Sequence, residues 1–359
     1  LFPYTTLFRS TIASSSGYSY QYKNMGQTSN KGVELQLDAI VVDAKDFGLN
    51  FNFNISYNRG KIDKLNGSSF WQSSSWAGTA AAGIEDFLVE EGGRLGEVYG
   101  YKTDGFYTAN DFTFDAEKGT YALKEGVNDC SSLIGGKVYP GSIKLKANED
   151  GEYKKERLGN TVPTVSGGFG LNARWKGFDF TAFFNYSLGN KIVNATKLGS
   201  SFYSGSSKNW NINDHFTSAS RYSWIDSSTG TNLLSSASIK ANGEAWTINR
   251  LNEINSNASI WNPAAATVMP LVDWAVEDGS FLRVNNITIG YTLPKLLVNK
   301  LNIQNIRIYV TGYNLHCFTK YSGTDPEVDC CTSTPMTPGI DYAAYPKSRS
   351  FVGGINVTF

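Results

Sequence analysis

The chain has 359 residues with 32 basic and 32 acidic side chains, so its formal net charge is zero. This balance argues against a nucleic-acid binder, which needs an excess of Lys and Arg to neutralise phosphates. Aromatic residues make up 14% of the chain and glycine occupies 36 positions, a composition typical of many short strands joined by tight turns. The sequence contains no apolar run of about 18 residues, which excludes a transmembrane helix but not a transmembrane β-barrel.

The first ten residues, LFPYTTLFRS (1–10), are expected to be foreign to the protein. They resemble the translation of a sequencing-library adapter, and no Met precedes them. We therefore leave them out of the fold prediction, as one leaves out a fusion scar. The expectation is a fragment whose own sequence runs over 11–359 and whose upstream part is missing.

Alternation of apolar and polar residues predicts the first strands. In LNFNFNISYNR (49–59) the odd positions from 49 to 57 are apolar and the even positions are polar, so this strand has one apolar and one polar face. The run KGVELQLDAIVV (31–42) before it is a second strand, and DFLVEEGGRLGEVYGYKTDGFY (86–107) after it is expected to add more strands. These segments indicate an all-β protein.

A hairpin follows at 165–188. Two alternating runs flank the tight Lys176-Gly177 turn, and their pattern is broken only at Phe183. Later strands are predicted over 279–293, 305–315 and 351–359, with a bulge where the first of these loses phase near Asn285 and Asn286. The total is about nine antiparallel strands.

The connections alternate in length along the chain. Short links are predicted at 43–46, 91–95, 176–177 and 294–302, and long polar loops at about 61–85, 109–163, 190–278 and 319–345. Short periplasmic turns and long extracellular loops are typical of an outer-membrane barrel. The final run 351–359 also has about the length that a tilted membrane strand needs.

The two faces of such strands have different expected surroundings. The apolar face meets lipid, with aromatic girdle candidates Tyr57, Trp175, Tyr186, Tyr291 and Phe359. The polar face would line a passage; the candidates are Asn50, Asn52, Asn54, Asn172, Arg174, Asp179, Asn185, Arg307 and Tyr309.

Aromatic residues in the long loops are candidates for contacts with a substrate or partner, because their rings stack on sugars while neighbouring amides and hydroxyls form hydrogen bonds. They are Trp71, Trp76, Tyr203, Trp210, Trp224, Trp246, Trp261 and Trp274. For any single ring, anchoring of the loop to itself or to the barrel mouth is the favoured interpretation.

Catalytic chemistry is not predicted. The sequence has two His residues and no nucleophile or phosphate-loop motif in a suitable context, so no enzyme, cofactor or metal site is expected. The adjacent Cys330 and Cys331 fit either disulfides or free thiols. The acidic segment DPEVD (325–329) could bind a cation or pair with Lys or Arg, but a solvated turn begun by Asp-Pro is the favoured interpretation, and no ligand is assigned.

Several segments, in order, resemble the SusC/RagA branch of TonB-dependent outer-membrane transporters of Bacteroidetes. The resemblance is strongest near the end of the chain, in DGSFLRVNNITIGYTLP (278–294), GYNLHCFTKYSGTDPEVD (312–329) and YPKSRSFVGGINVTF (345–359). Earlier landmarks are NKGVELQL (30–37), GYKTDGFY (100–107), LGNTVPTVSGGFGL (158–171) and KGFDFTAFFNYSLGN (176–190).

The resemblance implies the C-terminal part of a large outer-membrane barrel, 22-stranded when complete, normally closed by an N-terminal plug that is absent here. It further implies import of oligosaccharides or peptides under a SusD-like lipoprotein lid, driven by TonB–ExbB–ExbD. The family often carries a calcium-like acidic loop, but Ala147 stands where its first carboxylate would be. The edge of the last strand is expected to lack its partner, the first barrel strand.

Two other functions remain open on the residues alone. A passive porin or an autotransporter translocator would share the alternation and the loop asymmetry. A soluble, secreted carbohydrate-binding or hydrolase β-sandwich would also be rich in strands and aromatics, although it offers no reason for the segregation of loop lengths.

Overall fold

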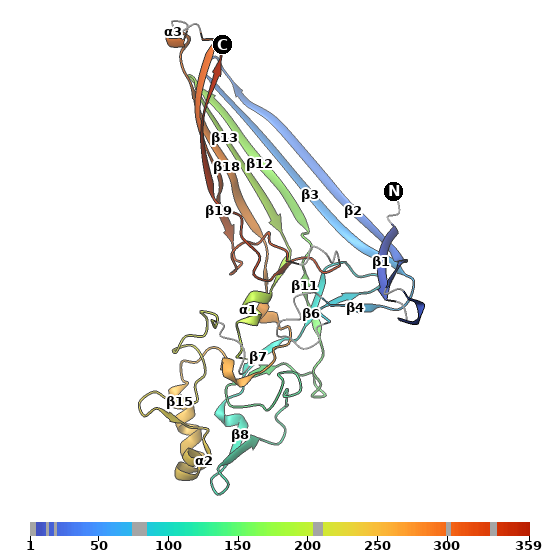
Figure 1. The fold of residues 1–359 in the computed structure, drawn as a ribbon, viewed down its shortest axis with the longest axis vertical. Coiled ribbons are helices and arrows are strands. Elements are labelled where there is room, and N and C mark those ends of the chain that lie inside the picture. The colour runs from blue at the N-terminus through green and yellow to red at the C-terminus, as the bar shows by residue number, and fades with distance from the viewer. Residues whose placement is uncertain are drawn as a thin grey trace.

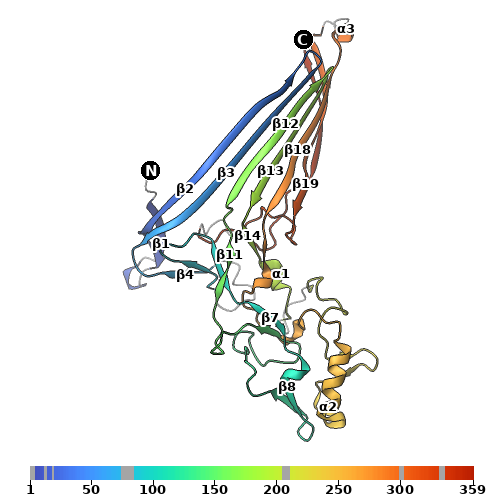
Figure 2. The ribbon, with the colours of Figure 1, turned by 180° about the vertical axis from the view of Figure 1, so that it is seen from behind.

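The computed structural model describes residues 5–11, 14–17, 20–73, 85–203, 211–298, 303–330 and 336–359. Within them the chain forms a long curved antiparallel sheet with a separate body of folded loops at one end of it (Figure 1). The view from behind shows the same division (Figure 2). Among these residues no helix is both long enough and apolar enough to cross a membrane.

The large sheet has eight strands in the order β1-β2-β3-β12-β13-β18-β19-β21. Neighbours pair in sequence order because each strand returns along the one before it. The strands are β1 (Thr5–Thr11), β2 (Tyr20–Asp43), β3 (Phe47–Leu65), β12 (Val165–Trp175), β13 (Phe178–Leu188), β18 (Phe281–Thr292), β19 (Asn305–Thr319) and β21 (Ser350–Thr358). β1 lies largely within the first ten residues and pairs with β2, while the foreign origin of those residues stays a prediction.

The predicted hairpin is confirmed. β12 and β13 pair without a shift from Val165 opposite Leu188 to Trp175 opposite Phe178. Its turn needs left-handed backbone at both positions, with φ of 46° at Lys176 and 92° at Gly177, which glycine adopts without strain. The bulge predicted near Asn285 is also present, as a register shift of β18 against both of its neighbours.

The ends of the sheet differ as the loop lengths predict. At one end, called the turn end, the links are 44–46, 176–177 and a connection that holds α3 (Lys295–Val298). At the other, the loop end, three long excursions leave the sheet between β3 and β12, β13 and β18, and β19 and β21. Figure 1 shows α3 and the C-terminus at the end opposite to the loop body.

The expectation of barrel strands over 86–107 is wrong. The segment forms β5 (Phe87–Val89), β6 (Glu97–Gly100) and β7 (Thr103–Phe106), which pair in two small sheets outside the large one. The 91–95 link therefore belongs to the loop body and not to the turn end. The physical reason is burial on both sides: consecutive residues Glu97 and Val98 are both buried, which a strand between lipid and water does not allow.

The three excursions fold into one body with a shared apolar core. Residues from all of them are buried together, including Phe112 and Ile143 from the first, Leu233 and Leu251 from the second and Ile340 from the third. The remaining strands are β4 (Phe70–Gln72), β8 (Phe112–Asp115), β9 (Thr120–Leu123), β10 (Ile143–Leu145), β11 (Glu156–Asn160), β14 (Lys191–Asn194), β15 (Ile225–Asp226), β16 (Thr231–Asn232), β17 (Val276–Asp278) and β20 (Ile340–Asp341).

Helices contribute little to the body. The body contains α1 (Ala195–Gly199) and α2 (Ser236–Ile254), with short 3-10 turns at Ala109–Asp111, Pro263–Ala265 and Asp273–Ala275; a further 3-10 turn, Ser14–Ser16, lies between β1 and β2. α2 begins where the Ser235 side chain accepts a hydrogen bond from Ser238 N, and it is broken at Gly243, whose φ is 76°.

Candidate functional site

The apolar face of the sheet consists of rows of side chains that cross it from strand to strand. One row runs from Leu37 through Phe53, Phe169 and Phe184 to Val284. The rings of Phe169 and Phe184 stack with their centroids 4.6 Å apart. Many side chains on this face are exposed, such as Ile289 at 57%, so the face is apolar and is not covered by other described parts of the chain.

Aromatic rings lie near both ends of the apolar face, as the girdle prediction requires. Trp175 and Tyr291 lie at the turn end on either side of Phe178, and Tyr57 lies near the loop end opposite Val165. From 165 to 175 along β12 the rise is roughly 33 Å at about 3.3 Å per residue. A tilt of about 45° reduces this to roughly 23 Å, close to the apolar band of about 25 Å in outer-membrane barrels.

The predicted passage residues all lie on the opposite, polar face. Ladder pairing aligns Asn50 with Asn172, Asn54 with Gly168 and Asn185, and Arg174 with Asp179. The other members share this face: Asn52 opposite Gly170, Arg307 opposite Asn356, and Tyr309 opposite Gly290 and Gly354. The structure therefore brings the nine candidates onto one surface.

Charged side chains gather at the turn end of the polar face. Arg174 forms an ion pair with Asp43. The carboxylate of Asp179 accepts from Arg307 Nη2 at 2.5 Å and from Nε at 2.9 Å, and the Arg307 guanidinium lies 4.9 Å from the Tyr309 ring centroid. This end of the face carries both signs of charge, held by fork-shaped hydrogen bonding.

A glycine makes room for the Asp179–Arg307 pair. The pair joins β13 to β19 across the intervening strand β18, where Gly290 lies between the two side chains. A Cβ at position 290 would lie 2.5 Å from Asp179 Oδ1 and 2.6 Å from Arg307 Nη2. The absence of a side chain at this position is therefore a condition of the ion pair.

The middle of the polar face is lined by amides and hydroxyls. Thr181 Oγ1 donates to Asn172 Oδ1 at 3.0 Å, and the hydroxyls of Thr288 and Thr311 lie 2.8 Å apart. A pocket of about 350 Å³ opens here, lined among others by Asn50, Asn172 and Thr181 together with the turn-end charges. Such a surface suits passage of a hydrated, hydrogen-bonding solute.

The loop end of the polar face holds a charged group that the sequence analysis did not favour. The turn begun by Asp325 and Pro326 is present, but the expectation that it is solvated is wrong for Asp325. Asp325 is 3% exposed and pairs with Arg283 of β18, which is itself 4% exposed, at 2.5 Å. Arg283 has no acidic residue next to it in the sequence. Within the described residues its carboxylate partners come from the connection between β19 and β21, and a local sequence pattern does not show such a long-range pair.

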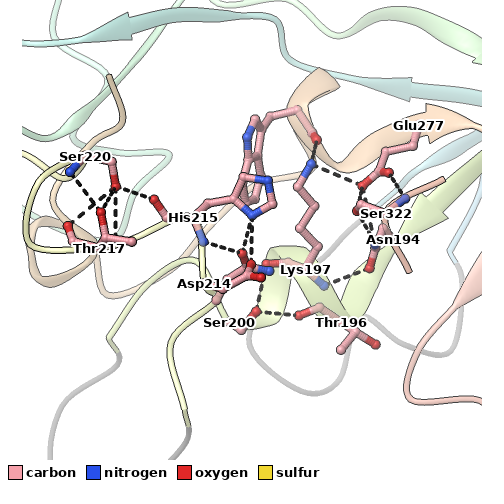
Figure 3. Close-up of polar contacts among 12 residues, drawn as sticks. Asn194, Thr196, Lys197, Ser200, Asp214, His215, Thr217, Ser220, Glu277 and Ser322 are labelled. Atoms are coloured by element: carbon pink, nitrogen blue, oxygen red, sulfur yellow. Dashed lines mark hydrogen bonds and ion pairs between the residues drawn. The ribbon is translucent and has the colours of Figure 1, made fainter. Parts of the chain in front are cut away.

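A buried ion pair forms the junction between the second excursion and the third (Figure 3). Lys197 of α1 contacts Glu277 of β17 at 3.1 Å and donates to the Trp274 backbone oxygen at 2.9 Å. Ser322 donates to Glu277 from its backbone N at 2.8 Å and from Oγ at 2.7 Å. Burial alone would raise the pKa of Glu277, but the hydrogen bonds from Ser322 and the charge of Lys197 lower it below its ordinary value.

The loop aromatics do not form one platform. Trp261 and Trp274 pack together with centroids 5.0 Å apart, and the Trp224 indole donates to Pro140 O at 2.5 Å. Trp71 in β4 and Trp246 in α2 are exposed but belong to opposite ends of the loop body (Figure 1). Tyr203 is exposed as well. Trp76 and Trp210 lie outside the described residues. Each role in binding stays a prediction.

A pocket of about 650 Å³ in the loop body has none of the predicted aromatics in its lining. It is formed around Tyr121, Asp129 and Lys137. Lys137 Nζ lies 4.1 Å from the Tyr121 ring centroid. Burial, together with neighbouring Tyr139, raises the pKa of Tyr121 to about 12, so this hydroxyl stays neutral near pH 7.

Hydroxyl, imidazole and carboxylate groups lie near one another at 214–220, but their geometry is not that of a catalytic triad (Figure 3). The Ser220 hydroxyl donates to the backbone oxygen of His215 at 2.6 Å. The ring of His215 is engaged through Nδ1, 3.1 Å from Asp214 Oδ1. A nucleophile must instead face the ring nitrogen of its base.

Metal ligands are not gathered in the part of the chain that is described, where no group of three or more His, Cys, Asp or Glu is placed to hold an ion. In the loop compared with a calcium site, the Asn148 side-chain oxygen accepts from the backbone N of Asp150 at 3.1 Å and of Glu152 at 2.8 Å. This oxygen supports the turn itself. Cys331 lies outside the described residues, so the two interpretations of the Cys330-Cys331 pair stay open.

Comparison with known proteins finds relatives among the TonB-dependent receptors. The chain is 29% identical to TonB-dependent receptor P3 of Formosa agariphila over 98% of its own length and 31% of that receptor. It is 23% identical to TonB-dependent receptor SusC of Bacteroides thetaiotaomicron over 94% of its length and 27% of that protein. The chain thus spans about a third of the length of the curated relatives it matches. No family model matches it.

Among solved structures, the RagAB peptide importer in its closed-closed state matches 99% of this chain and 32% of the solved chain, with a TM-score of 0.64 and 22% identity. At this identity the likeness shows the fold. It extends over both the large sheet and the loop body, because nearly the whole chain is aligned.

Proposed function

The chain is a relative of the TonB-dependent receptors of the SusC/RagA group over nearly its whole length, and we propose that it forms a wall segment and extracellular loops of an outer-membrane nutrient importer. The large sheet would be part of a transmembrane barrel. The apolar face would meet lipid, and the polar face with its nine candidate residues would line the transport passage.

The two-faced sheet is the observation that carries this proposal. The apolar rows continue across the strands with exposed aliphatic side chains, while the other face of the same strands holds charged, amide and hydroxyl groups. A water-soluble sandwich buries its apolar face against a second sheet, and within the described residues no second sheet packs on this one. Lipid is the partner that fits such a face.

Cargo and partners follow from the relatives as further parts of the proposal. We propose oligosaccharides or peptides as cargo, a SusD-like lipoprotein as the extracellular partner, and TonB–ExbB–ExbD as the energy source of the whole protein. The support for peptides is a fold match to a peptide importer, and the support for the lipoprotein is the match to SusC. Neither match selects one cargo class.

Cell fractionation and uptake test the proposal in two steps. The protein encoded by the intact gene should sediment with the outer membrane and require detergent for extraction, whereas a soluble sandwich would appear in the aqueous fraction. Uptake of labelled oligosaccharides and peptides is then compared with and without a functional TonB system. Uptake that continues without TonB identifies a passive porin and contradicts active import.

A further inference from the structure

Four charged residues at the loop end of the polar face form one closed group, called the clamp: Arg283, Asp325, Glu327 and Lys347. Arg283 Nη2 donates to Asp325 Oδ1 at 2.5 Å and its Nε donates to Glu327 Oε2 at 2.6 Å. Lys347 Nζ donates to the same Glu327 oxygen at 2.8 Å, and its backbone N donates to Asp325 Oδ2 at 3.2 Å. The charges of the two cations and the two carboxylates therefore cancel within the group.

The clamp joins the sheet to the connection between β19 and β21, whose described residues 320–330 and 336–349 we call the strap. Arg283 stands on β18 and the other three members stand on the strap. Figure 1 shows this connection between the lower end of the sheet and α1. At this point the strap is therefore attached to the large sheet by ion pairs and not by strand pairing.

The other side of the strap is fixed to the loop body. Tyr321 donates its hydroxyl to Asp341 Oδ2 at 2.6 Å, and Ser322 donates to Glu277 at the junction. β20 of the strap pairs in parallel with β14, Val193 opposite Ile340. The strap therefore contacts the loop body on one side and, through the clamp, the large sheet on the other.

Burial makes each charge of the clamp depend on its partner. Arg283 and Asp325 are both almost fully buried, and a charge in such surroundings is tolerated only while its partner is present. Loss of either partner leaves an uncompensated charge that draws in water. Arg283 shares a row with Gly168, Asn185 and Cys317 on the polar face, so water entering here reaches the face of the proposed passage.

We propose that Arg283 is a positioning residue that holds the strap on the polar face, and that release of the clamp widens the passage at its loop end. This inference rests on the proposed function in one respect, that the polar face lines the passage. The attachment of the strap itself does not depend on that function.

The same face supplies a matched control. Asp179 and Arg307 form another guanidinium–carboxylate pair, at 2.5 Å, but both residues belong to strands of the sheet. Asp179→Asn removes an ion pair of the same chemistry at the turn end without releasing a loop. A clamp-specific effect should be absent in this variant.

The first measurement follows release of the strap through Cys317, which lies directly opposite Arg283 on β19. In the intact protein, Cys130, Cys330 and Cys331 are replaced by Ser, and the rate at which a charged maleimide labels Cys317 is recorded. After each rate is divided by the thiolate fraction found from its own pH dependence, the double variant Asp325→Asn/Glu327→Gln should label at least tenfold faster than its parent, and Asp179→Asn within twofold of it. An unchanged rate in the double variant overturns the clamp.

The second measurement follows the passage. A cysteine at Asn172 on the polar face, in a background without the native cysteines, is treated in intact cells with polyethylene-glycol maleimides of increasing size. The clamp variant should admit larger reagents than the parent. Faster labelling of Cys317 with an unchanged size limit at 172 would make the clamp purely structural and overturn the widening.

Failure of the proposed function gives a different result. If a cysteine at 172 is not labelled in any variant even after the expected N-terminal plug is deleted, the polar face does not line an open passage, while the Cys317 rates still report on the clamp. If the double variant does not reach the membrane, Glu327→Gln alone should change the Cys317 rate in the same direction by a smaller factor, and no change there contradicts the clamp.

Discussion

The large sheet and the loop body use the same apolar side chains in opposite ways. In the sheet, Ile289, Val310 and Ile355 are exposed, and the polar groups lie on the opposite face of the strands. In the loop body, Phe112, Ile143 and Leu233 are fully buried, as in a water-soluble domain. Each apolar group lies away from water in both parts, because the proposed solvent of the sheet's outer face is lipid.

The core of the loop body should give the largest effect. Phe112→Ala removes a fully buried ring and is expected to cost about 3–5 kcal/mol, through lost burial and the cavity left behind. Limited proteolysis should show cleavage within the body while the sheet stays protected. The matched variant Ile289→Ala, on the exposed apolar face, should leave the cleavage pattern unchanged. If both variants lost protection from the protease equally, the result would contradict an apolar core in the loop body and a lipid-facing surface on the sheet.

A charge placed on either face of one strand should sharpen the comparison. Leu171 and Asn172 are neighbours in β12, on the apolar and the polar face. Leu171→Arg is expected to destabilise the sheet by about 2–4 kcal/mol, the cost of a cation near the middle of the bilayer. Asn172→Arg should be tolerated. The measurement is denaturant unfolding in lipid vesicles, and similar losses for both would count against a lipid-facing surface.

The glycine under the Asp179–Arg307 pair gives a smaller, local effect. Gly290→Ala forces a Cβ into both partners and is expected to cost about 1–3 kcal/mol, in the range of overpacking. Gly353→Ala is the control, because a Cβ there meets its nearest neighbour, Tyr309 O, only at 4.0 Å. Thermal unfolding of the two variants should separate them. A neutral Gly290→Ala would show that the pair does not need the gap.

Acid should weaken the junction of the loop body with the strap, as the smallest of these effects. The pKa of Glu277 is lowered from 4.5 in the folded protein, so its contribution is complete above that value and is lost as the pH falls through the lowered pKa. The protection of amides around Ser322, relative to their intrinsic exchange rates at each pH, should therefore fall as the pH drops through the lowered pKa of Glu277. Glu277→Gln should remove this pH dependence, and an identical acid response in that variant would contradict the assignment.

Local patterns were sufficient for the sheet. Period-two alternation places Asn50, Asn172 and Asp179 on one face without any tertiary information, and the Lys176-Gly177 turn fixes the register of the hairpin. The loss of phase near Asn285 likewise marks the bulge. These features depend on residues close together in the chain.

Long-range contacts explain what the sequence did not reveal. Segment 86–107 forms strands, but its burial on both sides comes from the other excursions, so it belongs to the loop body. The acidic turn at Asp325 is buried because Arg283, 42 residues away, is opposite it. Trp261 is buried and packs on Trp274, which agrees with the favoured interpretation of a ring that anchors its loop, but the sequence does not show which residues it packs against.

Spin labels along β12 test the central claim most directly. Single labels at positions 169–174 of the intact protein in lipid vesicles are compared for collisions with oxygen, which dissolves in lipid, and with a water-soluble nickel chelate. We predict that 169, 171 and 173 favour oxygen and that 170, 172 and 174 favour nickel. Access of nickel to both sets would contradict a sheet with one face in lipid and one face in a water-filled passage.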